Sequence, residues 1–242
     1  ALLSHGQRCL FSKRCGEAGL ADPFLPDTDI DWAPAGTVTG GERLLPSCLV
    51  HYPLPSNRDY LVPDWTTNGL SAGSCLEEAL LQGLLEVVEH DAIAIWWYNP
   101  LTLPGLDPAS FGSPEAEKFL NILNDEGWNI HLLNLTTDLN VPVIASVGLH
   151  RSKRERDPIV GFGADFRPDV ALSRALGEMA AERKSEPNIF KMNMNALECL
   201  GHDFHEMEMM RPLSGVPLLS ATSLGIEVGE DLLENINTLA KI

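Results

Sequence analysis

The sequence predicts an α+β fold, in which helices pack on a mixed sheet, and three observations support this. A long helical pattern runs from Ser74 to about Tyr98, two runs rich in apolar and β-branched residues follow it, and a second helical pattern comes after a glycine-rich stretch. Helical and strand patterns are therefore mixed, but they do not alternate as regular βαβ units. With 242 residues, of which 44% are hydrophobic, the chain can bury a substantial core.

The first 65 residues are rich in proline and glycine, which predicts loops with one or two strands near 44–52. The helix that starts at Ser74 should end at Asn99-Pro100, because the residue before a proline avoids the helical conformation. A second helix is predicted over 115–126 and is closed by a glycine.

Two strands are predicted over 129–135 and 141–147, paired across the polar turn between them. Residues 161–169 are expected to form a small-residue loop that opens another helix, with Pro168 in its first turn. The methionine-rich segment 184–212 is expected to be mobile, although its methionines could equally fill gaps in the core. A last helix is predicted over 229–242.

The helix that starts at Ser74 carries a row of polar side chains. At about 100° per residue, Glu78, Gln82, Glu86 and Glu89 share one arc. Six apolar residues occupy the opposite arc and should be buried: Leu80, Leu81, Leu84, Leu85, Val87 and Val88. Carboxylates held close together repel, and a divalent cation is their natural counter-charge.

A solvated helix face can also carry a row of glutamates. No lysine or arginine occurs between Ser74 and Pro100, whereas solvated helices commonly mix both signs of charge. Spacing alone leaves both interpretations open. Glu77 is set apart, because Ser74-Cys75-Leu76-Glu77 matches a capping box in which Glu77 returns to the Ser74 amide. Glu77 is thus predicted to be structural, and the functional candidates are Glu78, Glu86 and Glu89.

Composition limits the possible partners. A formal net charge of -17 argues against nucleic acid, since phosphate contacts require clustered lysine and arginine. The basic run 151–156 is best explained as a solvated turn, and an acidic peptide or phosphate site there is the alternative. No apolar run approaches the roughly 20 residues of a membrane helix. Five scattered cysteines indicate neither a disulfide framework nor a zinc site, so the cytoplasm is the simplest location.

Two blocks of this sequence resemble the YcaO proteins. The first block comprises 68–73, Glu77-Glu78-Ala79 and 86–92, and the second comprises 161–164 with 171–178. Upstream, 10–12 and Asp31-Trp32 are similar to the branch of that family that forms azolines. The resemblance covers about residues 40–183. It implies a single YcaO-like domain over 1–242, incomplete at both ends, with an entry segment at 1–65, an ATP-site core at 66–183 and a C-terminal part at 184–242.

The resemblance further implies an ATP-dependent enzyme that activates backbone amides of a precursor peptide. In the azoline branch, a Cys, Ser or Thr side chain adds to the amide carbon, and ATP phosphorylates the amide oxygen, which leaves as phosphate. By the family pattern, six residues would bind ATP and magnesium: Ser74, Glu78, Glu86, Glu89, His90 and Glu178. Magnesium would be held, through ATP, by Glu78, Glu86 and Glu89. A leader-binding partner resembling ubiquitin-activating enzymes and a homodimer are further expectations.

The chain departs from the family pattern at several places. His90 stands where an arginine would contact phosphate, and Ala181 stands where the family commonly has glutamine. An earlier block with a second Glu-x-x-Glu-Arg motif is not found in this sequence, nor is the family's proline-rich tail. Two alternatives follow: a thioamide-forming enzyme of the same family, and a non-catalytic YcaO-like scaffold that binds a peptide or partner. A cysteine hydrolase built on Cys75 is a weaker alternative, because no histidine partner can be assigned to that thiol.

Overall fold

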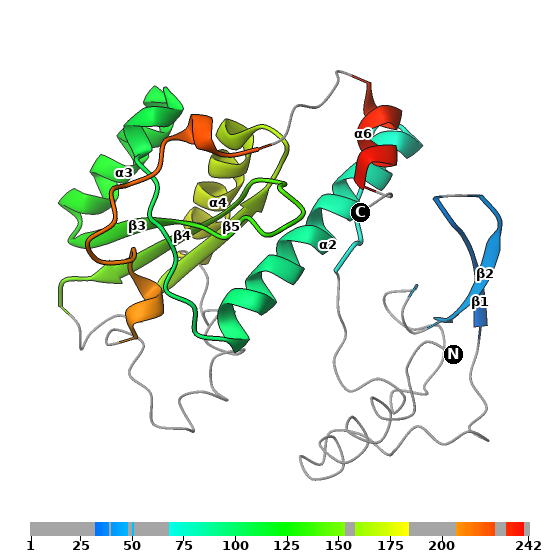
Figure 1. Ribbon diagram of the computed structural model, residues 1–242, viewed down its shortest axis with the longest axis horizontal. Coiled ribbons are helices and arrows are strands. Elements are labelled where there is room, and N and C mark those ends of the chain that lie inside the picture. The colour runs from blue at the N-terminus through cyan, green and yellow to red at the C-terminus, as the bar shows by residue number, and fades with distance from the viewer. Residues whose placement is uncertain are drawn as a thin grey trace, which may run out of the picture. The chain divides into compact units, whose positions relative to one another are not determined.

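The computed structural model describes residues 32–38, 40–47, 50, 68–152, 158–183, 207–225 and 231–239 (Figure 1). The chain divides into two compact units, Ala1–Thr67 and Asn68–Ile242. Several features of the sequence lie outside the described residues: the run 10–12, Asp31, most of 48–52, residues 153–156 of the basic run and the segment 184–206. In the described part of the chain, no helix is long and apolar enough to cross a membrane.

The described part of the first unit is a β-hairpin. Strand β1 (Trp32–Gly36) pairs antiparallel with β2 (Glu42–Pro46), and the register places Trp32 opposite Pro46. In the connecting turn, the Thr37 hydroxyl donates to the carbonyl oxygen of Gly40 at 2.7 Å. Gly40 and Gly41 both have positive φ, which glycine adopts without strain. The strand predicted near 44–45 is thereby confirmed.

The second unit contains a three-stranded antiparallel sheet in the order β3-β4-β5. Its strands are β3 (Trp128–Asn134), β4 (Val143–His150) and β5 (Ile159–Ala164). The pairing of β3 with β4 confirms the two strands predicted at 129–135 and 141–147. In the turn between them, the Thr136 hydroxyl accepts from the Val143 amide at 3.2 Å.

Helices cover both faces of this sheet (Figure 1). Alternate residues of β4 contribute to different clusters: Val143, Ala145 and Val147 pack toward α2 (Leu76–Tyr98), and Ile144 packs with α4 (Pro168–Glu182). This alternation is the period-two pattern of a strand buried on both sides. The remaining helices are α3 (Pro114–Asp125), α6 (Leu232–Leu239) and the short 3-10 helices η2 (Pro108–Phe111), η3 (Glu208–Met210) and η4 (Ala221–Ser223). These elements confirm the predicted α+β class.

The loop predicted over the first part of 161–169 is wrong, because Ile159–Ala164 forms strand β5. Glycine there serves close packing rather than loop flexibility. A Cβ atom on Gly161 would strike the carbonyl oxygen of Ala175 and the amide of Met179, and one on Gly163 would strike the backbone of Ala171 and Ala175. The glycines therefore allow α4 to lie directly on β5. The helix itself begins at Pro168, as predicted.

A buried serine adds a polar link at the same contact. The Ser146 hydroxyl lies 3.1 Å from the Gly161 carbonyl oxygen and 2.9 Å from that of Ala175, so its single proton can serve either acceptor. Ser146 is fully buried, and a hydroxyl without an acceptor would be costly there. The Ser146 hydroxyl thus links the backbones of β5 and α4 and helps to set the distance between them.

Helix α2 buries a narrower stripe than the sequence predicts. Leu81, Leu85 and Val88 are buried as expected, but Leu80 is 38% exposed and Val87 is 49% exposed. These two residues lie roughly 120–140° around the helix from the centre of the buried stripe. The acids lie on the other flank of that stripe, and Glu78, Glu86 and Glu89 are half-buried there.

The C-terminal predictions are confirmed in part. Helix α6 lies within the predicted 229–242. Met209 and Met210, at the end of the methionine-rich segment, are buried in the core cluster shared with α2. For these two residues the core-filling alternative is therefore correct, because both side chains are buried in that cluster.

Candidate active site

The loop before α2 lies against the first turns of that helix. The Ser71 hydroxyl donates to the carbonyl oxygen of Ala79 at 2.5 Å. A Cβ atom on Gly83 would lie 2.7 Å from the carbonyl oxygen of Gly69, so glycine is needed where the loop backbone crosses the helix. Gly69 itself has φ of +83°. Glycine at these two positions sets the path of the loop that leads to Ser74.

The predicted capping box is wrong by one residue. Helix α2 begins at Leu76 with Cys75 as its N-cap, and Cys75 makes no side-chain capping bond. The carboxylate of Glu78, rather than that of Glu77, accepts from the Ser74 amide at 2.6 Å and from the Ser74 hydroxyl at 2.7 Å. These two bonds lower the pKa of Glu78, the hydroxyl contributing most. Because the helix starts one residue later than predicted, Glu78 takes the local structural role and Glu77 is exposed.

Two turns further along α2, Glu86 and His90 lie side by side. The Nε2 atom of His90 is 3.9 Å from a carboxylate oxygen of Glu86, and both side chains are partly exposed. The pair is an i, i+4 contact on the helix surface. His90 therefore offers a ring nitrogen at the position where the family resemblance expects a phosphate contact.

Among the acids of the described residues, Glu89 has the largest shift in pKa. Burial is the main cause that raises its pKa to about 7, and the neighbouring carboxylate of Glu178 raises it further, with a smaller contribution from Glu86. The backbone amide of Ala164 donates to Glu89, and the charge of Arg174 is nearby; both oppose the shift. Three acids from α2 and α4 thus share one region, and the structure does not neutralise them fully.

Glu178 links α4 to strand β5. Its carboxylate accepts a short hydrogen bond from the Phe162 amide. Its pKa is raised, chiefly because the carboxylate is desolvated and also because Glu182 is near, while the Phe162 amide acts in the opposite direction.

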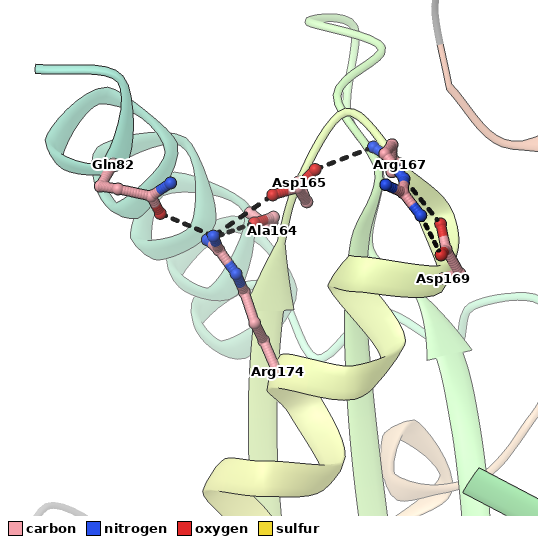
Figure 2. A network of polar contacts seen from close by, with 6 residues as sticks. All are labelled: Gln82, Ala164, Asp165, Arg167, Asp169 and Arg174. Atoms are coloured by element: carbon pink, nitrogen blue, oxygen red, sulfur yellow. Dashed lines mark hydrogen bonds and ion pairs between the residues drawn. The ribbon is translucent and has the colours of Figure 1, made fainter. Parts of the chain in front are cut away.

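Arg174 supplies the positive charge that the sequence of α2 lacks (Figure 2). Its Nη1 donates to the Ala164 carbonyl oxygen at 3.0 Å, and its Nη2 donates to Oε1 of Gln82 at 2.6 Å. The same Nη2 lies 3.3 Å from a carboxylate oxygen of Asp165. The guanidinium therefore joins helix α2, the end of β5 and helix α4.

The structure groups some of the predicted site residues and separates others. Glu86, Glu89 and Glu178 interact electrostatically, and His90 contacts Glu86. Ser74 and Glu78 are bonded to each other at the start of α2. Sequence reasoning missed Arg174 as the counter-charge of the acids. The signal was the single arginine on the second helical block, four residues before Glu178, but no local spacing connects it to α2.

The acid set fits a magnesium ion that arrives with a nucleotide. Among the described residues, no group of three or more His, Cys, Asp or Glu side chains is placed so that it could hold a metal ion by itself. Magnesium commonly takes one or two carboxylates together with phosphate oxygens and water, so a complete protein cage is not required. Burial and the nearby Glu178 carboxylate raise the pKa of Glu89, and a divalent cation beside it would oppose both effects.

Comparison with known proteins agrees with this fold. Residues 3–236 match a family model described as "YcaO cyclodehydratase, ATP-ad Mg2+-binding". The chain belongs to the YcaO family. It is 29% identical over 164 residues to an uncharacterized protein of Methanothermobacter thermautotrophicus, a match that covers 66% of this chain and 42% of that protein.

Solved structures extend the likeness to three dimensions. A heterocyclase in complex with substrate and cofactor superposes with a TM-score of 0.81 at 25% identity, over 98% of this chain and 33% of that one. The YcaO protein of Methanopyrus kandleri, bound with AMPPCP and Mg2+, gives a TM-score of 0.65 at 26% identity, over 89% of this chain and 56% of that one. The chain thus spans between a third and about half of the length of these relatives.

Proposed function

We propose that this chain carries the ATP site of an enzyme that activates backbone amides of a ribosomally made peptide and cyclodehydrates Cys, Ser or Thr residues to azolines. The observation that carries the proposal is the group formed by Glu86, Glu89 and Glu178 with Arg174 beside it. Acids that are incompletely neutralised, next to one well-held cation, suit a magnesium-bound triphosphate. The family description, ATP and Mg2+ binding, supports the same assignment.

The chemistry explains why ATP is needed. A side-chain thiol or hydroxyl adds to the amide carbon, its proton is lost, and the former carbonyl oxygen attacks the γ-phosphorus of ATP. The bond between the γ-phosphorus and the β-γ bridging oxygen breaks, so that ADP leaves. Phosphate then departs with the amide oxygen, the C=N bond forms as the amide proton is lost, and the net change of the peptide is the loss of one water. Magnesium, when bound, neutralises phosphate charge.

Each site residue has a proposed role. Glu86, Glu89 and Glu178 would hold magnesium ions with the nucleotide, and Arg174 would keep the local charge balanced. Glu78 would bind the magnesium-nucleotide from the start of α2, where its hydrogen bonds to Ser74 fix the first turn. His90 would contact phosphate more weakly than an arginine, because an imidazole lacks the planar fork of donors with which a guanidinium binds phosphate.

The first experiment follows phosphate release and peptide mass together. The full-length protein is incubated with magnesium-ATP, a cysteine-rich precursor peptide and a leader-binding partner resembling ubiquitin-activating enzymes. Phosphate released in step with the loss of one water per site supports the proposal. Glu86→Gln and Glu89→Gln should abolish both signals, whereas Glu77→Gln, at an exposed position on the same helix, should leave them unchanged. Phosphate release without any change of peptide mass argues against the proposed substrate.

Two other functions can be separated in the same assay. An oxygen-to-sulfur mass change in the presence of sulfide would assign the thioamide-forming reaction instead. A non-catalytic peptide-binding or partner-binding scaffold is favoured by His90 and Ala181, which replace two polar residues of the family pattern. His90→Arg tests this alternative: a gain in magnesium-ATP affinity indicates a working nucleotide site, and no binding before or after the change supports a scaffold. The homodimer and the cytoplasmic location remain predictions.

A further inference from the structure

Gln82 is the one neutral member of the polar row on α2 that comprises Glu78, Gln82, Glu86 and Glu89. It lies one helical turn from Glu78 and one from Glu86. Its amide oxygen accepts from Nη2 of Arg174 at 2.6 Å, which joins α2 to α4 across 92 residues of sequence (Figure 2). The bond ties together the two helices that carry the acids of the candidate site.

The other two partners of Arg174 come from a single short stretch. Ala164, whose carbonyl oxygen accepts from Arg174, is the last residue of strand β5, and Asp165 follows it directly. The Asp165 side chain is 16% exposed and also accepts from the Arg167 amide at 3.0 Å, so the backbone holds it in place. Two acceptors therefore anchor the guanidinium to the end of β5, and Gln82 is the acceptor that directs it toward α2.

We propose that Gln82 is a positioning residue for the nucleotide reaction, which holds the Arg174 guanidinium beside the acids of α2 without cancelling its charge. This inference rests on the proposed function and adds a specific role to a residue outside the metal-binding acids. A guanidinium presents its donors in a rigid planar fork, so an acceptor on each side fixes its orientation. Loss of the Gln82 acceptor leaves the fork anchored on the β5 side alone.

The neutrality of Gln82 is central to this role. Asp165 already contributes one negative charge to Arg174. A glutamate at position 82 would contribute a second and would also add a carboxylate to the row on α2 that includes Glu86 and Glu89. An amide supplies the same hydrogen bond without a charge, so the positive charge of Arg174 remains available to Glu89 and to phosphate oxygens.

The test compares four forms of the full-length protein: unaltered, Gln82→Met, Arg174→Met and the double variant. Methionine has nearly the shape of glutamine but cannot accept a strong hydrogen bond. We expect Gln82→Met to weaken magnesium-ATP binding by about 10-fold, as for the loss of one hydrogen bond to a charged group. Because Gln82 acts through Arg174, the double variant should bind no more weakly than Arg174→Met alone. Additive losses, or unchanged binding by Gln82→Met, would overturn the inference.

Two further variants separate positioning from general structure. Glu77→Met places the same side chain on an exposed site of α2 and should bind magnesium-ATP like the unaltered protein. Gln82→Glu keeps the acceptor but adds a charge, so the Arg174 guanidinium should stay restricted while nucleotide affinity falls. Equal nucleotide affinity of Gln82→Glu and the unaltered protein would contradict the argument from neutrality. Thermal melting checks that each variant is folded.

A readout without nucleotide distinguishes this inference from the proposed function. Nitrogen NMR of the arginine side chains should resolve the Nη signals of Arg174 in the unaltered protein, because its rotation is restricted. Those signals should broaden in Gln82→Met and persist in Glu77→Met. If magnesium-ATP binds and the variants behave as expected but no peptide is modified, the peptide chemistry is wrong and the positioning role stands. If Arg174 is equally restricted without Gln82, the positioning role is wrong whatever the reaction.

Discussion

The contact between α4 and β5 depends on the absence of a side chain at Gly161, and Gly161→Ala tests this directly. A methyl group there would meet the carbonyl oxygen of Ala175 and the amide of Met179, with the Met179 Cα at 3.0 Å. Backbone atoms of a helix cannot rotate away as a side chain can, so α4 must move off the strand. Overpacking of this kind costs about 1–3 kcal/mol. Lower flexibility of the unfolded chain offsets about 0.4–1 kcal/mol, which leaves a net destabilisation of about 1 kcal/mol.

Gly177 provides a matched control on the same helix. It is exposed, and a Cβ atom there would meet nothing within 4 Å. Gly177→Ala should therefore stabilise the protein by about 0.5–1 kcal/mol, the usual gain in helix propensity. Urea unfolding of both variants, followed by far-UV circular dichroism, measures the two free energies. The reasoning is refuted if Gly161→Ala is as stable as the unaltered protein, or if both variants change stability in the same direction.

Two further predictions concern α2. The pKa of Glu89 is about 7 in the folded protein and 4.5 ordinarily, so the folded state binds the extra proton, and stability should fall by about 3 kcal/mol as pH rises from below 4.5 to above 7. Glu89→Gln should remove most of this slope in pH-dependent urea unfolding, and an unchanged slope would contradict the assignment. Trp96 is 1% exposed and packs edge-on against Trp97 and Phe162, so Trp96→Ala should cost about 3–5 kcal/mol. Tyr98→Ala, at an 81% exposed position, should change stability by no more than about 0.5 kcal/mol, and similar losses for both variants would argue against a buried Trp96.

Local pattern determined most of the elements. The spacing of apolar residues predicted α2 and α3, and apolar runs separated by a polar turn predicted the pairing of β3 with β4. These signals are readable because each arises from residues a few positions apart on one helix or strand. The α+β class and the family resemblance followed from the same local blocks, and both are confirmed.

Small shifts in local geometry reversed two assignments. The start of α2 lies one residue beyond the predicted start, which exchanged the roles of Glu77 and Glu78. Gly161 and Gly163 were taken as loop residues because glycine often marks turns, but here they admit a helix onto a strand. Glycines in a turn and glycines under a packed helix look the same in the sequence, and only the packing partner distinguishes the two uses.

The sequence by itself determined the family, the helix that carries Glu78, Glu86 and Glu89, and the acid Glu178 on a second block. Only the tertiary structure decided which of these acids share an environment and which cation they face. Arg174 and Gln82 are 92 residues apart, and their bond at 2.6 Å exists because α2 and α4 both lie against β5. Hydrogen bonds of this kind depend on distances of a few ångströms between elements, and no periodicity along the chain encodes them.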